Sequence, residues 1–153
     1  IRFGELNDSS LHAKLLCRSR LYLVASPAYL AKHGTPHQPE QLLQHALIGF
    51  TQPTHLNSWP LQHQGQRFNI HPKIKASNGE TVRQLALHGA GITCLSRFLV
   101  QDDLNAGRLQ ALFEDQIELQ YQNIHAVYYQ QEHLPKRVRL FIEFLAQQLA
   151  IYL

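Results

Sequence analysis

Residues 72–95, PKIKASNGETVRQLALHGAGITCL, decide the class of fold to which this chain belongs. The opening segment, 72–76, predicts a short strand, and residues 77–80, SNGE, have the sequence of a capping box that starts a helix. The next residues place apolar side chains at helical spacing and end in the glycines of GAG, where a helix stops. Residues 92–95, ITCL, predict a buried strand. The stretch is therefore a strand–helix–strand unit, the repeating element of α/β folds.

Strands and helices alternate on both sides of this unit. Further strands are predicted at 20–25, 46–50, 109–113 and 124–129. Further helices are predicted at 28–33, 40–44 and 97–105, and a last one begins at Pro135. The pattern predicts an α/β domain whose sheet is mostly parallel and is covered by helices on both faces.

Local signals describe two of these regions more closely. Residues 57–61 and 66–70 flank Gln64-Gly65, a pair typical of a hairpin turn. The last helix is expected to pack through one apolar stripe, which is formed by Val138, Phe141, Leu145 and Leu149.

The composition is that of a chain able to bury a core. Its 153 residues are 44% hydrophobic and 16% charged, enough for one compact domain or one lobe of a larger one. The sequence has no run of 18 apolar residues, so we expect no membrane span. Two cysteines in this length indicate a reducing, cytoplasmic location. The chain has no methionine and opens inside an apolar/polar alternation without a secretion leader, which indicates a piece of a longer protein.

The net charge of +3 at pH 7 and the pI near 9.0 raise the question of nucleic-acid binding. The basic residues are scattered in small groups and form no stripe interleaved with aromatic residues. We therefore expect a solvated basic surface, and no direct contact between this chain and DNA.

No set of residues in the sequence predicts an enzyme or a metal site. Ten histidines are spread along the chain, and the closest two, His33 and His37, are separated by a glycine and a proline that prevent a helical turn. There is no HExxH, CxxC, G-x-S-x-G or phosphate-binding glycine loop. The paired carboxylates at 102–103 and 114–115 fall in segments expected to be exposed. We therefore expect no catalytic activity, no metal and no cofactor.

One feature indicates ligand binding. The strand at 73–76 leads directly into a helix that starts at Ser77-Asn78-Gly79. Backbone N–H groups at a helix start, with the helix dipole behind them, bind anions, and ligands of open α/β sheets bind at such corners. The alternative is that Ser77 and Asn78 only cap the helix.

Several motifs resemble those of LysR-type transcriptional regulators. The run VASPAYLAKHG at 24–34, followed by Thr35-Pro36, is similar to the segment in which this family first crosses between its subdomains. Further motifs lie in the family's order along the chain: IRFGEL and DSSL near the start, ASNG at 76–79, GAGI at 89–92 and HLPKRV at 133–138. The resemblance covers essentially the whole chain.

The resemblance implies an α/β fold of the periplasmic-binding-protein type (type II). Two Rossmann-like subdomains would be joined by two crossover strands, 21–26 and 124–129, around an effector cleft. Residues 1–20 would be the remnant of a partial first subdomain. Residues 21–129 would form the nearly complete second subdomain with both crossovers, and 130–153 the return helix of the first.

Carried over position by position, the resemblance also implies an effector site made of four groups of residues. These are Gly4 and Glu5; Gly49, Phe50 and Thr51; Ser77, Asn78 and Gly79; and Val127 and Tyr128. Core packing is an equal alternative for Phe50 and Val127, and a hydrogen bond in the hinge region is favoured for Glu5.

The function that the resemblance implies is a cytoplasmic effector-sensing domain. It would bind a small anionic metabolite, and binding would shift the relative pose of two lobes. The regulator would be a homodimer or homotetramer, and it would contact DNA only through a helix-turn-helix absent from this chain. The alternative is a solute-binding protein of a transport system that shares the fold. An enzyme on the same fold would need an acid–base pair in the cleft, and the sequence places none there.

Overall fold

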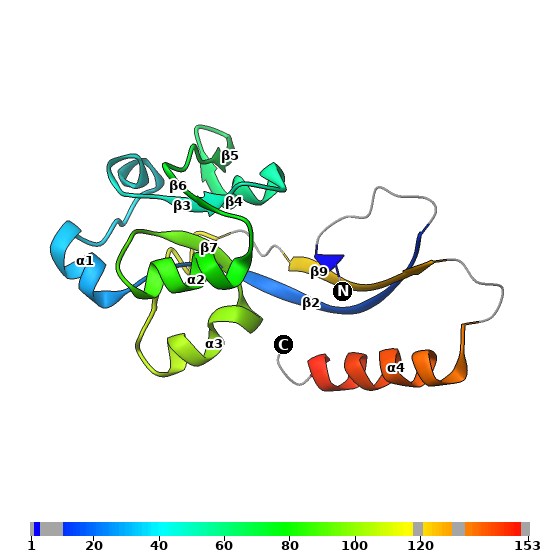
Figure 1. Ribbon diagram of the computed structural model, residues 1–153. Coiled ribbons are helices and arrows are strands. Elements are labelled where there is room, and N and C mark those ends of the chain that lie inside the picture. Colours follow the sequence, from blue (N-terminus) through cyan, green and yellow to red (C-terminus); the bar gives the residue numbers. More distant parts are fainter. Residues whose placement is uncertain (1, 4–10, 118–120, 130–133, 151–153) are drawn as a thin grey trace. The chain divides into compact units, whose positions relative to one another are not determined.

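The computed structural model describes residues 2–3, 11–117, 121–129 and 134–150. The chain divides into two compact units, of which unit 1 consists of residues 1–20 and 121–153 and unit 2 of residues 21–120. Figure 1 labels their helices and strands in chain order.

Unit 1 is built on antiparallel strands in the order β1-β9-β2. The first part of β2 (Leu11–Ala25) pairs with β9 (Tyr121–Tyr129), which also pairs with β1 (Arg2–Phe3). A bulge at Leu16 interrupts the register between β2 and β9, and both Leu16 and Cys17 are buried there. Beyond Arg20, β2 continues into unit 2 as one unbroken strand.

We expected the two crossover strands, 21–25 and 124–129, to lie side by side, but they do not pair with each other. Residues 124–129 pair with 11–17, whereas 21–25 pair with β7 and β8 of unit 2. The sequence grouped 121–129 with the second subdomain, but by its contacts this strand belongs to unit 1. The predicted strand began near residue 20 because LHAKLLCRSR is rich in charged and polar side chains. Pairing with β9 extends the strand through that segment, and local propensity does not report such pairing.

Unit 2 contains most of the elements that the sequence predicts. They are α1 (Pro27–His33), η1 (Pro39–Gln44), β3 (Ile48–Phe50), η2 (Thr54–Asn57), β4 (Ser58–His63), β5 (Gln66–Asn69), β6 (Ile74–Ala76), α2 (Gly79–Leu87), β7 (Thr93–Ser96), α3 (Arg97–Asn105) and β8 (Gln110–Leu112). The hairpin is confirmed, because Gln64 and Gly65 turn β4 into β5 with φ of 53° and 76°. The 3₁₀ turn η2 was not predicted.

Parallel pairing is limited, in the part of the chain that the structure describes, to β3 with β6 and a bridge between Leu47 and Ile92. β2 runs antiparallel to β7 and β8, and β4 runs antiparallel to β5. The prediction of a mostly parallel sheet is therefore wrong. An alternation of strands and helices does not reveal the direction in which a long crossover strand enters the sheet.

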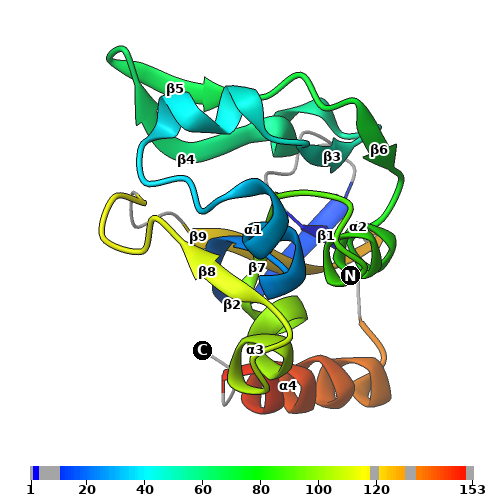
Figure 2. The ribbon, with the colours of Figure 1, turned by 90° about the vertical axis from the view of Figure 1, so that its left-hand side faces the viewer.

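Two hydrophobic clusters form the core of unit 2. One contains the hairpin residues Trp59 and Phe68, whose rings lie 6.3 Å apart, together with residues of α1 and β2. The other contains the buried faces of α2 and α3 and the strand residues Phe50 and Ala76. In Figure 2, β3 and β6 lie side by side and the hairpin lies next to them. Phe50 and Ala76, the last residues of β3 and β6, thus both pack in the second cluster.

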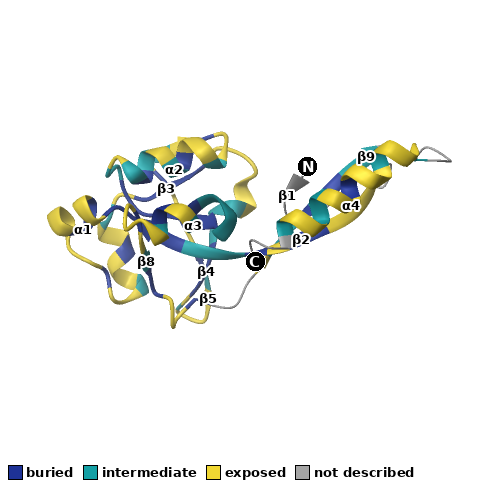
Figure 3. Cartoon of the chain, turned by 90° about the horizontal axis from the view of Figure 1, so that it is seen from below, coloured by how far each residue is buried: buried dark blue, intermediate teal, exposed yellow. Residues whose placement is uncertain are grey.

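Helix α4 (Lys136–Ala150) covers the predicted stripe except at one position, where Ile142 is buried in place of Phe141. Ile142 is buried, and Val138, Leu145 and Leu149 are half-buried, which agrees with three of the four predicted positions. Phe141, the fourth, is 59% exposed. Figure 3 shows the exposed face of the helix beside its buried band. Residues 141 and 142 both fit the helical spacing of this stripe, so only the packing partner determines which of the two is covered.

Candidate functional site

The candidate site lies where β3 and β6 end. The two strands are parallel neighbours with Phe50 opposite Ala76, so their carboxyl ends meet at one edge of the sheet. The N–H of Thr51 donates to the carbonyl of Ala76 at 2.9 Å, which continues the pairing past the last strand residue. The structure thus brings together two of the predicted groups, 49–51 and 77–79, within unit 2 (Figure 2).

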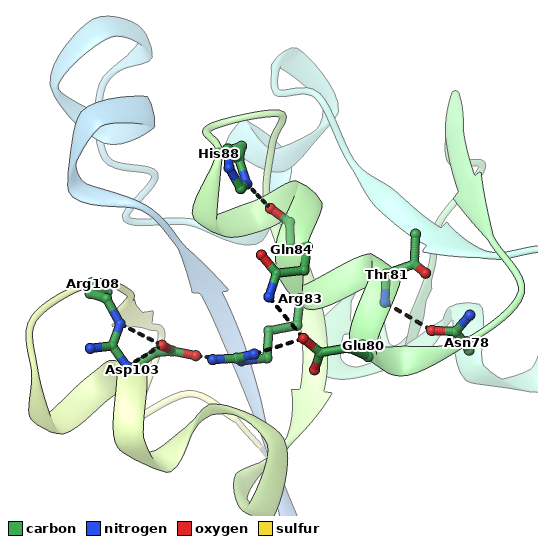
Figure 4. Close-up of polar contacts among 8 residues, drawn as sticks. All are labelled: Asn78, Glu80, Thr81, Arg83, Gln84, His88, Asp103 and Arg108. Atoms are coloured by element: carbon green, nitrogen blue, oxygen red, sulfur yellow. Dashed lines mark hydrogen bonds and ion pairs between the residues drawn. The ribbon is translucent and has the colours of Figure 1, made fainter.

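Helix α2 starts at this edge, and Asn78 is its N-cap. The backbone of Asn78 is extended (φ −144°, ψ 157°), and its side-chain oxygen accepts a hydrogen bond of 2.8 Å from the N–H of Thr81. The predicted capping box, with Glu80 bonding back to Ser77, is wrong. Glu80 instead accepts hydrogen bonds from Arg83 at 2.9 Å and Gln84 at 2.8 Å, as Figure 4 shows.

These contacts determine which polar groups the site offers. The Asn78 side chain accepts the hydrogen bond of the Thr81 N–H. Gly79 and Glu80 lie in the first turn of α2, where backbone N–H groups have no hydrogen-bond partner within the helix. The hydroxyl-bearing residues Thr51 and Ser77 are exposed next to them. Arg83 partly neutralises the Glu80 carboxylate, which would otherwise repel an anion at the helix start. The arrangement suits a small group that accepts several hydrogen bonds.

Gly49 and Phe50, two of the predicted site residues, are buried. Phe50 is only 9% exposed and packs in the core. Its N–H and its carbonyl are both bonded to the side-chain amide of Asn57, at 2.8 and 2.9 Å. Sequence reasoning missed Asn57, which it placed at the start of a strand. No local signal shows which backbone group, seven residues away, a side-chain amide will meet.

The remaining predicted site residues belong to unit 1. Val127 and Tyr128 are half-buried on β9, opposite Ala13 and His12. The rings of Tyr128 and His12 are stacked with centroids 6.0 Å apart. Gly4 and Glu5 lie outside the described residues.

A buried carboxylate links α2 to α3 behind the site. Asp103 is fully buried, contrary to the expectation that 102–103 would be exposed, and accepts hydrogen bonds from Arg83 at 2.5 Å and Arg108 at 2.7 Å. Burial raises the pKa of Asp103, but the hydrogen bonds and charges of the two arginines outweigh it and leave the pKa below its ordinary value. Arg83 thus contacts Asp103 and Glu80 together (Figure 4).

A groove in unit 2 lies away from the predicted residues. This groove, of about 510 Å³, runs between α3 and β8, and none of the predicted site residues lines it. Its polar lining includes Arg97, Gln101 and Asn105, which are spaced along one face of α3 and joined by side-chain hydrogen bonds.

The described residues contain no group of three histidine, cysteine or acidic side chains placed to hold a metal ion. Cys17 and Cys94 are buried and not disulfide-bonded. Burial raises the pKa of Cys94 to about 12, so its thiol stays protonated and packs as a small apolar group. Among the described helices, none is long and apolar enough to span a membrane.

The α/β architecture is of the type II periplasmic-binding-protein-like class, the fold of LysR regulatory domains. The chain belongs to the LysR substrate binding domain family, whose pattern it matches over residues 1–150. It is 45% identical to the HTH-type transcriptional regulator CrgA of Neisseria meningitidis over 150 residues, which are 97% of this chain and 50% of that protein. It is 35% identical to PtxR of Pseudomonas aeruginosa over 97% of this chain and 48% of that protein. The chain thus spans about half the length of these curated relatives.

Solved structures agree with this assignment. The regulatory domain of Neisseria meningitidis CrgA superimposes with a TM-score of 0.87 at 45% identity, covering 95% of this chain and 72% of that one. The effector domain of AmpR from Pseudomonas aeruginosa gives a TM-score of 0.78, covering 98% of this chain and 71% of that one. Since its identity is 20%, this second likeness shows the fold alone.

Proposed function

We propose that this chain is the effector-sensing part of a LysR-type regulator and that it binds a small anionic metabolite at the carboxyl ends of β3 and β6. Its relatives are named transcriptional regulators, which supports a role in regulation. The observation that carries the location is the parallel register of β3 and β6, which brings Thr51 and Ser77 together at the start of α2.

The chemistry of this corner favours a carboxylate or phosphate group. Such a group accepts hydrogen bonds from the Gly79 and Glu80 amides and from the Thr51 and Ser77 hydroxyls, and the dipole of α2 adds to the attraction. The corner presents hydrogen-bond donors and no acid–base pair, so we propose a binding site without catalysis. The roles of Gly4, Glu5, Val127 and Tyr128 stay predictions.

The wider proposal concerns the whole regulator. We propose a cytoplasmic homo-oligomer that contacts DNA through a helix-turn-helix outside this chain. The alternative of a transport solute-binding protein is not favoured, because the relatives at 45% and 35% identity are transcriptional regulators.

Replacing Gly79 tests the site with a matched control. Gly79→Pro and Gly79→Ala both add a Cβ that lies 2.8 Å from the Leu99 Cδ1, the far end of a flexible side chain, so both variants displace Leu99 equally. Only proline also removes the N–H group. Proline suits the first helical position, and the extended backbone of Asn78 is compatible with a following proline. The two variants therefore differ chiefly by one hydrogen-bond donor.

Binding of benzoate, succinate and inorganic phosphate is measured by calorimetry and by thermal shift. We expect at least one anion to bind the wild-type chain and the alanine variant. The proline variant should bind it about tenfold to a hundredfold more weakly, the value of a charge-assisted hydrogen bond of ~1.5–3 kcal/mol. Equal affinity of the two variants would place the anion elsewhere, for example in the groove beside α3. Binding of none of the three anions would also count against the proposal.

A further inference from the structure

The backbone of β3 needs hydrogen-bond partners on both of its sides. Thr51 bonds to Ala76 on the β6 side, so the two-residue period of a strand directs Ile48 and Phe50 to the opposite side. At Ile48 the partners come from the chain at β7: the N–H donates to Ile92 O at 2.9 Å, and the carbonyl accepts from the Thr93 hydroxyl at 3.0 Å. The pairing of this segment with the β3 segment is a single bridge, between Leu47 and Ile92, and it does not extend to Phe50.

At Phe50, the side chain of Asn57 supplies the hydrogen bonds that a neighbouring strand would otherwise make. Its side-chain amide carries one acceptor and one donor side by side, as a peptide group does. The Oδ1 atom accepts from Phe50 N at 2.8 Å, and the Nδ2 atom donates to Phe50 O at 2.9 Å. Its backbone carbonyl also accepts from Ile70 N at 2.9 Å, which fixes Asn57 to the end of β5. We call the pair of hydrogen bonds between the Asn57 side chain and Phe50 the clamp. Asn57 is thus held to β3 by its side chain and to the end of β5 by its backbone.

The clamp also explains why residue 49 is a glycine. A Cβ at this position would lie 2.5 Å from Asn57 Oδ1 and 2.6 Å from Pro72 Cγ. A side chain at residue 49 is thus incompatible with Asn57 in its place. The clamp therefore depends on two segments of the chain: Asn57 makes the hydrogen bonds, and Gly49 leaves the space that the Asn57 side chain occupies.

We propose that Asn57 is a positioning residue of the anion site: it holds the end of β3 so that Thr51 stays beside Ser77 and the start of α2. Asn57 acts through Phe50 and Thr51 and does not itself contact the ligand. This inference rests on the function proposed above, since it assigns Asn57 a role in that same site.

The test compares Asn57→Ala and Gly49→Ala with a control variant, Tyr29→Phe. Tyr29 is buried in the same unit, and its hydroxyl accepts a hydrogen bond of 2.9 Å from Ala46 N, at the other end of the β3 segment. Its removal lowers the stability of the unit without touching the clamp. A further variant, Asn57→Asp, keeps the acceptor for Phe50 N and removes the donor for Phe50 O.

Two measurements are made on each folded variant. Amide hydrogen exchange gives the protection of Phe50 relative to Ile48, whose N–H bonds to Ile92 and serves as the internal reference. We expect this ratio to fall about tenfold or more in Asn57→Ala and Gly49→Ala, less in Asn57→Asp, and not in Tyr29→Phe. Calorimetry with benzoate, succinate and phosphate gives the anion affinity. It should fall about threefold to tenfold in the two clamp variants and stay unchanged in the control.

The outcomes separate the two proposals. If the wild-type chain binds none of the anions, the proposed function fails, while the exchange ratio still tests whether Asn57 holds the strand end. If anions bind and the clamp variants lose no more affinity than Tyr29→Phe, Asn57 is a stability residue and the positioning role is wrong. If the protection of Phe50 relative to Ile48 is unchanged in Asn57→Ala, then Asn57 does not hold the end of β3 and the inference is wrong.

Discussion

Replacing Asp103 by alanine should destabilise unit 2 strongly, because it removes the buried carboxylate that joins two helices. Asp103 has no exposed surface and bonds to Arg83 of α2 and to Arg108 beyond α3. Removing one partner from a buried ion pair costs ~3–5 kcal/mol. The arginine side chains are 20% and 54% exposed, so water partly replaces the lost carboxylate. We therefore expect a loss of about 2–3 kcal/mol in the free energy of unfolding.

Urea unfolding of the 153-residue chain, followed by circular dichroism, measures this loss, and Asp102→Ala is the matched control. Asp102 is the exposed neighbour on the same helix, so its replacement should change the free energy of unfolding by no more than about 0.5 kcal/mol. Asp103→Asn should fall between the two, since its amide oxygen accepts from one arginine while its NH₂ group faces the other. A loss in Asp103→Ala below about 0.5 kcal/mol would refute the reasoning, because the buried pairs would then contribute nothing net.

The pH dependence checks the same carboxylate independently. The pKa of Asp103 is lowered from its ordinary value of 3.8 in the folded chain. Its contribution is therefore fully present above pH 3.8 and is lost as the pH falls from there through the folded-state pKa. The difference between wild type and Asp103→Ala should be constant at higher pH and shrink in this acidic window. A difference that grows on acidification would contradict the assigned direction of the pKa.

Two further predictions follow from buried contacts of the described residues. Tyr29→Phe should cost about 0.5–1.5 kcal/mol in urea unfolding, because the Ala46 N–H loses a part-buried hydrogen bond; a change near zero would mean that water replaces the hydroxyl. On α4, Ile142→Ala should cost about 2–4 kcal/mol and Phe141→Ser about 0.5 kcal/mol or less, since one side chain is buried and the other is not; the reverse order would restore the stripe predicted from sequence. The exposed apolar side chains of Leu140, Phe141 and Phe144 on α4 favour self-association of this chain. Replacing all three by serine should weaken it in sedimentation velocity, and an unchanged distribution would exclude this face.

Interactions between residues close in the sequence were predictable. The hairpin turn needs two residues with positive φ, and Gln64-Gly65 provides them. Helix α1 starts at Ser26-Pro27 as its sequence indicates, because the Ser26 hydroxyl accepts from the N–H of Tyr29, three residues on. The start of α2 was found for the same reason, although the cap is Asn78 and the capping box is absent. The motifs that resemble the LysR family also gave the fold class and the family.

The candidate site was predictable only in part. The strand-to-helix corner at 77–79 is a local feature. Its place next to 49–51 was implied only by the family resemblance, and the structure supplies the parallel register of β3 and β6 that brings them together. Asn57 is different, since its importance lies in contacts with Phe50 and Ile70 that no pattern in its own neighbourhood indicates. Gly49 was predicted as a ligand contact, whereas its packing against Asn57 and Pro72 shows why a glycine is required there.

The sequence by itself thus determined the helices of unit 2, the hairpin, the corner that starts α2 and the family, because caps, turns and helical periodicity depend on residues a few positions apart. Only the tertiary structure decided which strand β2 joins along each half of its length, which of Phe141 and Ile142 is covered on α4, and that Asp103 is buried. Each of these depends on a partner distant in the sequence. A side chain such as Asp103 is buried only when groups such as Arg83 and Arg108 arrive to compensate its charge.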